Sequence, residues 1–424
     1  YQMTKGIEIN KSIDLFHNFK EGYRGVLAIN DIQKSEELVR VERCNCLGSK
    51  SEDSSKEEWE KMIENQGIAF FKNKSLTTED LHLTPGCFTV LRLLHEWDKG
   101  LDSKFYHYLS ILPKNHRILV EWGESELSYL KGTSAEPLSL VDNLEKQFET
   151  FEKFAKNHPK LWSQSVVTKE KFSKALNWVR SRGFTVDGEP YMIPCADMFN
   201  HNPGNQSALF EHISDDLNDA YVMRATKPIK AGNEIFSSFG QLSNSHLLNS
   251  YGFILSSNPF DSIILPSKIL MDACKTSFLK ITMMEGTTES EESWKKRIEM
   301  VGSCLEAPLS EKNNFILTKY DMLPEAVTDV IQTVLFSEDP LLVYGTLVKA
   351  LGLKLNSYKQ FDEMASNETD SIILAKALIR EESLFIKDLK SQLMQECLMM
   401  EEDLESSSND EKKSNNQNKK RKKH

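Results

Sequence analysis

The spacing of hydrophobic positions changes several times along the chain. Residues 25–29 and 37–41 are short apolar runs between turns, which predicts strands of a small β unit. From about residue 59 to residue 179 the apolar positions recur every three or four residues, as on one face of a helix. Strand-like runs return between 191 and 254, and beyond about 259 the spacing is helical again. The pattern therefore predicts an α+β chain that ends in a helical domain.

Apolar stripes mark the expected helices on both sides of the second β region. In the first helical stretch they comprise Phe88, Leu91, Leu94 and His95, and Leu144, Phe148, Phe151 and Phe154. In the second they comprise Val327, Val330, Ile331, Val334 and Leu335, and Leu374, Leu378, Phe385, Leu389 and Leu393. A stripe of this kind is typical of a helix packed against others, and it indicates no chemistry by itself. Between them, residues 221–223 and 234–236 are expected as strands, the second following a turn at 230–233.

The last residues, 406–424, are polar, of low complexity, and end in the basic run 419–423. Too few apolar side chains are left there to bury, so we expect a disordered tail. The basic run fits a nuclear import signal, and a solvated tail without specific function stays open. The chain as a whole carries a net charge of −11. An acidic body does not suit a nucleic-acid binder, whereas it suits an enzyme whose partner presents lysines.

The composition, with 39% hydrophobic and 27% charged residues in 424, is that of a globular protein of two or three domains. No run approaches the ~20 apolar residues needed to cross a bilayer, and no secretory signal begins the chain. Because it does not begin with Met, we expect a further segment upstream. Seven scattered cysteines predict free thiols in a reducing compartment. Only Cys44 and Cys46 are close, without a second pair at a zinc-ligand distance, so no metal site is expected.

Several common catalytic motifs are absent from the sequence. There is no Gly-x-Ser-x-Gly elbow, no P-loop, no His-Glu-x-x-His and no strand-linked Gly-x-Gly-x-x-Gly. This argues against hydrolases of these types, P-loop nucleotidases and dinucleotide-binding enzymes.

Two segments stand out instead. Residues 194–202 read Pro-Cys-Ala-Asp-Met-Phe-Asn-His-Asn. Residues 231–240 read Ala-Gly-Asn-Glu-Ile-Phe-Ser-Ser-Phe-Gly and are followed by Tyr251-Gly252-Phe253. Alone, an Asn-His pair before Pro-Gly is typical of a loop whose side chains bond the backbone. Together and in this order, the segments resemble the two signature motifs of SET-domain methyltransferases, Asp-x-x-Asn-His and Gly-x-x-(aliphatic)-x-x-(aromatic)-Gly…Tyr-Gly-Phe.

Other parts of the chain extend the resemblance. The turn Gly22-Tyr23-Arg24-Gly25 lies where the family has a glycine motif, and residues 180–184, Arg-Ser-Arg-Gly-Phe, resemble its Ser-Arg-x-Phe. The first helical stretch looks like the large insertion of the branch that includes the RuBisCO large-subunit lysine methyltransferase, and the helices after 260 look like its substrate-binding domain.

The resemblance implies a SET-type β fold of short strands with a large helical insertion, followed by an all-α C-terminal domain. The expected segments are 1–58 and 180–258 for the two parts of the SET domain, 59–179 for the insertion, 259–405 for the substrate-binding domain and 406–424 for the disordered basic tail.

The resemblance also implies S-adenosylmethionine as the cofactor. The turn from Gly22 to Gly25 would surround its methionine part, and Arg182 would pair with its carboxylate, which suits a guanidinium fork. Asn200 and His201 would hold its amino group and adenine, and Tyr251 to Phe253 would line the adenine or the lysine channel.

At the reacting centre the resemblance places Tyr251 and Phe239, and on the substrate side Gly183, Phe184 and Phe88. Asp197 would brace the site rather than act as a base. Methyl transfer from a sulfonium to an amine is an in-line displacement, so positioning supplies much of the rate. A lysine, with an ordinary pKa of about 10.4, must enter neutral, which a desolvated aromatic channel favours. Neither a metal nor an enzymic base is obligatory.

Two departures from the family pattern stand in these motifs. Phe239 occupies the position where the family usually has a tyrosine whose hydroxyl points at the reacting nitrogen. Loss of such a donor can cost a few kcal/mol of barrier, which predicts a lower rate or a changed degree of methylation unless Tyr251 substitutes. The glycine turn is also one residue longer than the usual Gly-x-Gly.

Three functions follow as alternatives. The first is a protein-lysine N-methyltransferase acting on a non-histone protein in the nucleus or cytoplasm, without binding nucleic acid or membrane. Gly183 favours lysine, because relatives that methylate a histidine in actin have Asn there, and the Cys-rich zinc flanks common in histone-directed enzymes are absent. The second is a catalytically weak SET protein that binds cofactor or partner as an interaction module, which Phe239 keeps open. The third is an unrelated α+β interaction protein with coincidental motifs.

Overall fold

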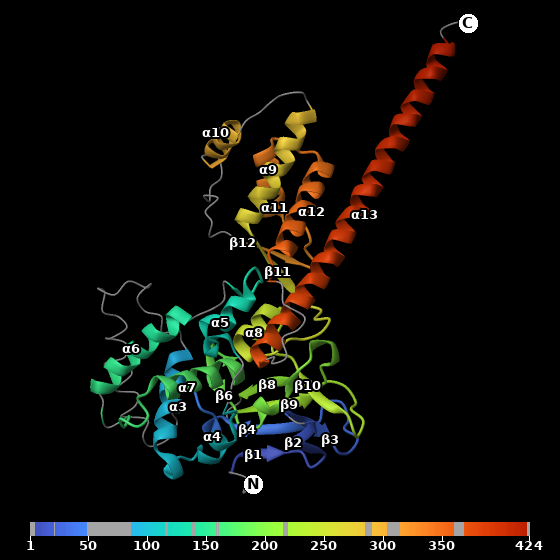
Figure 1. The fold of residues 1–424 in the computed structure, drawn as a ribbon. Helices are drawn as coiled ribbons and strands as arrows, with labels where there is room; N and C mark the ends of the chain where they lie inside the picture. Colours follow the sequence, from blue (N-terminus) through green and yellow to red (C-terminus); the bar gives the residue numbers. More distant parts are fainter. Residues whose placement is uncertain are drawn as a thin grey trace. The chain divides into compact units, whose positions relative to one another are not determined.

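The computed structural model describes residues 5–20, 22–48, 86–114, 118–136, 141–157, 159, 161–214, 219–284, 291–302, 314–359 and 369–421 (Figure 1). Two compact units can be distinguished. Unit 1 consists of Tyr1–Trp122, Ser139–Leu242 and Leu247–Phe253, and unit 2 of Gly123–Leu138, Ser243–His246 and Ile254–His424. Short strands and long helical regions together confirm the predicted α+β class.

Two four-stranded sheets make up most of the β structure of unit 1. Their strand orders are β1–β4–β9–β8 and β2–β3–β10–β7. Each sheet pairs strands from before residue 43 with strands from residue 200 onward, so neither is complete without both parts of the sequence (Figure 1). The strands are β1 Ile7–Ile9, β2 Ile13–Lys20, β3 Tyr23–Ala28, β4 Glu37–Glu42, β7 Asn200–His201, β8 Ala208–Ser214, β9 Asp219–Ala225 and β10 Glu234–Ser237.

The strands predicted at 25–29, 37–41, 221–223 and 234–236 are confirmed as β3, β4, β9 and β10. Successive side chains of a strand point to opposite faces, so one face can pack on a core while the other meets solvent or a ligand. Ile235 of β10 lies opposite Val26 of β3 in an antiparallel register, and both side chains are fully buried. This pairing fixes the second motif beside the glycine turn.

Helices of unit 1 follow the predicted stripes where the structure describes them; residues 59–85, also predicted to be largely helical, lie outside the described residues. Leu91, Leu94, Phe151 and Phe154 are buried, and the Phe151 ring stacks on that of Phe172 with centroids 5.4 Å apart. The elements are α3 Gly86–Asp98, α4 Tyr106–Ile111, α6 Val141–Asn157 and α7 Lys169–Arg182, followed by the strand pair β5 Gly183–Val186 and β6 Glu189–Met192.

Unit 2 is mainly helical, and α8 Asn244–Tyr251 has its first residues in unit 2 and its last in unit 1. The stripe on α11 is buried throughout, and Leu378, Phe385, Leu389 and Leu393 of α13 are buried as predicted. The other elements are α5 Glu124–Leu127, α9 Ser267–Met284, α10 Glu291–Gly302, α11 Glu325–Leu335, α12 Pro340–Asn356 and α13 Asp370–Arg421.

Three features of unit 2 differ from the sequence-based expectation. First, the domain is not entirely helical, because β11 Ser262–Pro266 pairs antiparallel with β12 Asn314–Thr318. The signal was present: Ile263 and Leu265 are buried in alternation with less buried neighbours, which is a strand pattern. Second, α13 continues to Arg421, where we expected a disordered tail. Residues 370–421 contain no Gly or Pro, the two residues least compatible with the interior of a helix.

Third, residues 123–138 belong to unit 2, although the sequence placed them in the insertion. A buried polar cluster holds them there. Glu382 of α13 accepts hydrogen bonds from the Ser134 backbone N–H (2.9 Å) and the Tyr358 hydroxyl (2.6 Å), and Lys354 of α12 donates to the Gly132 carbonyl (2.5 Å). Burial raises the pKa of Glu382 and lowers that of Lys354, so each depends on these partners.

Two further observations concern the described residues as a whole. None of their helices combines the length and the apolar character that crossing a membrane requires. The five cysteines whose side chains the structure describes form no disulfide with one another.

Candidate functional site

The Asn-His pair is placed by an unusual strand contact. Strand β7, which consists of Asn200 and His201, runs parallel to β10, with Asn200 opposite Phe236 and His201 opposite Ser237. Because β10 also pairs with β3, the first motif, the second motif and the glycine turn meet in one sheet. Residues that are far apart in the sequence, in β3 and in β7 and β10, therefore lie at one site.

The glycine turn closes directly on Asn200. The Asn200 Nδ2 donates to the Arg24 carbonyl and to Glu234 Oε1, both at 2.8 Å. The Tyr23 hydroxyl donates to the same carboxylate at 3.0 Å, and burial, helped by the charge of Glu234, raises the pKa of Tyr23 to about 12. Gly25 faces this cluster, and a Cβ there would collide with the Glu234 carboxylate and the Asn200 amide. A side chain at position 25 would therefore displace the Glu234 carboxylate and the Asn200 amide from the hydrogen bonds that join them.

Gly22 stands at the start of the turn with φ +73°, a left-handed conformation that favours glycine. Glu234, which joins Tyr23 to Asn200, was not among the residues singled out from the sequence. The sequence did indicate Glu234, because it belongs to the second motif and precedes the buried Ile235. Its side chain therefore points to the opposite face of β10.

Arg182 is the last residue of α7, and its guanidinium is fixed by Asp197. Its Nη1 donates to the Asp197 carbonyl at 3.0 Å and to Asp197 Oδ2 at 3.2 Å. The same Oδ2 accepts from the Tyr108 hydroxyl of α4 at 3.0 Å. The Asp197 side chain is fully buried, and burial raises its pKa although Arg182 and Tyr108 act in the opposite direction. These hydrogen bonds support the expected bracing role of Asp197. No sequence motif indicated that Tyr108 contributes to the site.

A second arginine lies near the first. Arg24 contacts the Met198 sulfur at 3.6 Å and lies 5.6 Å from the centre of the Phe16 ring. Burial lowers the pKa of Arg24, and the positive charge of Arg182 lowers it further. Among the described residues, no carboxylate forms an ion pair with Arg24. Two close cations, of which only Arg182 is paired with a carboxylate, form a region where an anionic ligand group is favoured.

Four rings from the two motifs form a continuous group. Phe239 stacks on His201 with centroids 5.0 Å apart and on Tyr251 at 4.9 Å. Phe253 lies 6.2 Å from both His201 and Tyr251. His201, Tyr251 and Phe253 thus meet in this ring group, and Arg182 lines one cavity together with Phe239 and Tyr251.

His201 is held in one neutral tautomer. The Phe239 N–H donates to His201 Nδ1 at 2.9 Å, so the ring hydrogen of the neutral imidazole sits on Nε2. Nε2 is buried without a hydrogen-bond partner among the residues that the structure describes. Burial lowers the pKa of His201 to about 4. A donor of this kind is suited to an acceptor atom of a ligand.

This lowered pKa predicts an acid-sensitive contribution to stability. Between pH 6.5 and about 4 the unfolded chain binds a proton on His201 that the native state does not bind. The contribution is therefore complete above pH 6.5 and is lost as the pH falls to about 4. We expect His201→Gln to remove on the order of 2 kcal/mol of the stability difference between neutral pH and about pH 5, as measured by urea unfolding. Identical pH dependence in the variant and the wild type would contradict the assignment.

A cavity of about 240 Å³ opens beside these groups. Five residues expected from the sequence line it: Arg182, Gly183, Phe184, Phe239 and Tyr251. The remaining lining residues are Ser181, Thr185, Asp197, Phe210 and Ser238. Phe210 of β8 and Phe184 of β5 are in ring contact at 4.5 Å, so two strands distant in sequence build one wall.

Several predicted site residues do not line this cavity: Phe88, which is half-buried on α3, and Gly22, Tyr23, Arg24, Gly25, Asn200, His201 and Phe253. The expected place of Phe88 on the substrate side stays a prediction. The lining residues Thr185, Phe210 and Ser238 had no sequence signal beyond their proximity to the motifs.

The residues present fit S-adenosylmethionine. The paired cations Arg24 and Arg182 suit its carboxylate, and the orphaned Nε2–H of His201 suits an acceptor of its adenine. The glycine turn leaves open space at Gly22. The stacked rings of His201, Phe239 and Tyr251 offer an apolar surface for the rest of the ligand. Among the described residues no three His, Cys, Asp or Glu side chains group as metal ligands.

Comparison with known proteins extends these observations. Residues 23–240 match the profile of the family described as SET domain. The chain is 26% identical over 291 residues to the ribosomal lysine N-methyltransferase set10 of Schizosaccharomyces pombe, covering 64% of this chain and 47% of that protein. It is 32% identical over 180 residues to the N-lysine methyltransferase SETD6 of Mus musculus, covering 39% of this chain and 37% of that one.

A third relative is the ribulose-1,5 bisphosphate carboxylase/oxygenase large subunit N-methyltransferase of Nicotiana tabacum, 29% identical over 200 residues, with 44% of this chain and 40% of that protein covered. The matched segments span half or less of each of these three relatives.

Solved structures agree on the fold. The SET domain of LSMT bound to lysine and AdoHcy superposes with a TM-score of 0.61 at 18% identity, covering 93% of this chain and 89% of that one. Rubisco LSMT bound to AdoMet gives 0.53 at 16% identity, covering 88% and 85%. At this identity the likeness establishes the fold alone.

Proposed function

Because the chain belongs to the SET-domain family, we propose that it is an S-adenosylmethionine-dependent protein-lysine N-methyltransferase. The observation that supports this most is the cavity that Arg182, Phe239 and Tyr251 line together. The Phe239 ring also stacks on His201, which follows Asn200 in β7. The relatives named as lysine N-methyltransferases point in the same direction.

The cofactor supplies an electrophilic methyl group on a sulfonium. In our proposal the chain contributes position: Arg182, oriented by Asp197, and Arg24 bind the carboxylate, and His201 donates to the adenine. Asn200 is already committed to the Arg24 carbonyl and Glu234, so its side chain shapes the glycine turn, and its backbone is the part left to meet the ligand. Holding reacting groups in line can supply about 7–11 kcal/mol of a barrier.

The aromatic side is proposed to receive the lysine. Phe239 and Tyr251 stack on each other, Phe184 and Phe210 are in ring contact, and all four line the cavity. A lysine side chain in this environment loses hydration, which lowers its pKa and favours the neutral nucleophile. Burial raises the pKa of Tyr251, so its hydroxyl stays protonated and can orient the amine. No side chain of the site needs to act as a base.

A non-histone protein is the proposed substrate. The named relatives concern a ribosomal substrate and an enzyme subunit, and the net charge of −11 suits a lysine-bearing protein better than a nucleic acid. We propose the nucleus or cytoplasm as its location, on the basis of the terminal basic run.

The direct test combines calorimetry and labelled methyl transfer. We expect the purified chain to bind S-adenosylmethionine and to transfer labelled methyl from it to lysine residues of a lysate, identified by mass spectrometry. Binding without transfer would support the alternative of a catalytically weak SET protein that acts as an interaction module, for which Phe239 is the specific observation. Absence of binding would refute both.

Restoring a tyrosine at position 239 addresses this alternative. Since the Tyr251 hydroxyl already lies in the same ring stack, we expect Phe239→Tyr to change kcat by less than about tenfold and to shift the distribution of mono-, di- and trimethyllysine. Single-turnover kinetics and mass spectrometry of the product provide the measurement. An increase well beyond tenfold would instead identify the wild type as a weakened catalyst.

A further inference from the structure

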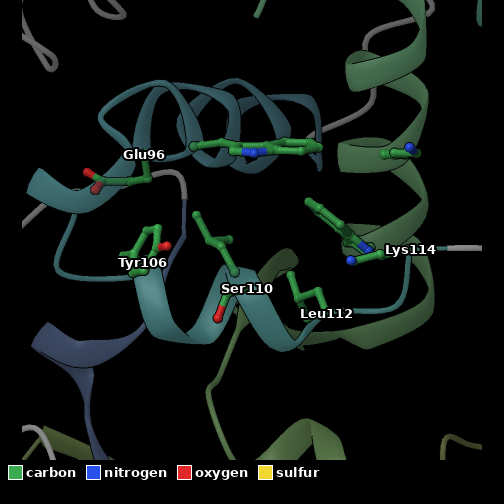
Figure 2. A pocket seen from close by; sticks show the side chains of 10 residues that line it. Glu96, Tyr106, Ser110, Leu112 and Lys114 are labelled. Carbon is green, nitrogen blue, oxygen red and sulfur yellow. The ribbon is translucent and has the colours of Figure 1, made fainter.

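A second cavity, of about 430 Å³, lies among the helices of unit 1 (Figure 2). It shares no lining residue with the cavity described above. Its lining residues come from α3, α4, α7 and the segments next to them: Glu96, Trp97, Gly100, Tyr106, Leu109, Ser110, Leu112, Lys114, Lys174 and Trp178. None of them belongs to a motif that the proposed methyl transfer uses.

Two indole rings give this cavity a rigid apolar wall. The rings of Trp97 and Trp178 lie with centroids 4.8 Å apart at an angle of 42°. The Trp178 Nε1 donates to the Pro113 carbonyl at 2.8 Å, and the Lys171 ammonium lies 5.5 Å from the centre of the Trp97 ring. Rings fixed in this way are available to a ligand without a further ordering cost, so an apolar body is favoured here.

The carboxylate that lines the cavity is already engaged. Glu96 is almost fully buried and accepts from the Lys99 ammonium at 2.8 Å and from the Ser103 hydroxyl at 2.6 Å. The Ser110 hydroxyl donates its hydrogen to the His107 carbonyl at 2.8 Å, so its oxygen remains as a neutral acceptor.

The charged group that remains is a donor. Within the part of the chain that the structure describes, the Lys114 ammonium, the Trp97 Nε1 and the Tyr106 hydroxyl make no hydrogen bond. Lys114 and Trp97 can only donate. Figure 2 shows Glu96 and Tyr106 at one end of the cavity and Lys114 at the other. The engaged carboxylate and the unengaged ammonium therefore lie at opposite ends.

We propose that this cavity binds a small amphipathic anion, an aryl or short alkyl carboxylate whose apolar body lies on the two indoles and whose charge meets Lys114. Aromatic walls can also form cages for ammonium groups. A cation is disfavoured here, because Lys114 and Lys174 line the cavity, Lys171 lies over Trp97, and Glu96 is already paired. The proposal is independent of methyl transfer.

The test uses the full chain and defined probes. Anilinonaphthalene sulfonate, an aromatic anion, should bind saturably with energy transfer from tryptophan, and phenylbutyrate should displace it more strongly than phenylbutylamine. Ser110→Phe, at an exposed position of α4, should fill the cavity and weaken dye binding more than about tenfold. Lys114→Gln should weaken the anionic dye about 3- to 10-fold and the neutral N-phenylnaphthylamine less than about twofold.

Lys153→Gln, which removes the same charge from an exposed position of α6 outside the cavity, is the matched control and should change neither dye. Circular dichroism and S-adenosylmethionine calorimetry verify that each variant is folded. Equal dye binding by Ser110→Phe and wild type would overturn the assignment of the cavity. Stronger displacement by phenylbutylamine, or no saturable binding of either anion, would overturn the proposed ligand class.

Discussion

Replacing Arg182 by methionine is expected to lower kcat/KM for methyl transfer by about 100-fold, mainly through weaker cofactor binding. Hydrogen bonds to charged groups are worth about 1.5–3 kcal/mol, and about 2.8 kcal/mol corresponds to a factor of 100. The substitution also leaves the fully buried Asp197 carboxylate without its cation, which costs about 3–5 kcal/mol of stability when a buried pair is broken. Isothermal calorimetry with S-adenosylmethionine and chemical unfolding measure the two effects separately.

A double variant distinguishes binding from folding. Asp197→Asn combined with Arg182→Met removes the stranded charge, so stability should largely return while cofactor affinity stays low. Arg182→Lys keeps a positive charge without the two-pronged donor geometry, and should give an intermediate affinity. If the double variant recovers both stability and affinity, then Arg182 has only a structural role and our assignment of the carboxylate site is wrong.

The two sequence motifs could be recognised because their chemistry is local. The segment that contains Asn200 and His201 and the segment that contains Phe239 have fixed residues at short spacing, and both lie on short strands that pair with each other. The helical stripes were equally informative, because burial on one face of a helix is a regular property of the sequence. These features explain why the fold class and the residues near the cavity could be predicted.

Contributions that depend on long-range packing could not be predicted in this way. Tyr108 reaches Asp197 from a short helix of the insertion, 89 positions earlier in the chain, and a single tyrosine in a helical stretch has no distinguishing pattern. The place of residues 123–138 in unit 2 depends on Glu382, which accepts a hydrogen bond from the Ser134 backbone N–H 248 positions earlier in the chain. Likewise, the composition of the last residues indicated disorder, whereas helix formation in α13 depends on local backbone preference.

Tyr251→Phe is the second substitution with a large expected effect. Tyr251 is the last residue of α8, lines the cavity beside Phe239, and its hydroxyl makes no hydrogen bond within the described part of the chain. Its removal should therefore leave the fold intact. With a phenylalanine already at 239, it also removes the remaining phenol from the ring stack. Loss of a donor aimed at the reacting group costs about 100-fold or more in kcat, so we expect a fall of this size with cofactor affinity nearly unchanged.

A swapped pair makes this expectation specific. In Phe239→Tyr combined with Tyr251→Phe the hydroxyl moves to the adjacent ring, whose centroid lies 4.9 Å away. Activity should recover to within about tenfold of the wild type if a hydroxyl anywhere in the stack can orient the amine. No recovery would mean that only the position of Tyr251 presents the hydroxyl correctly. An undiminished rate in Tyr251→Phe alone would contradict the proposed catalytic role, because the amine would then be oriented by shape and desolvation without a phenol donor.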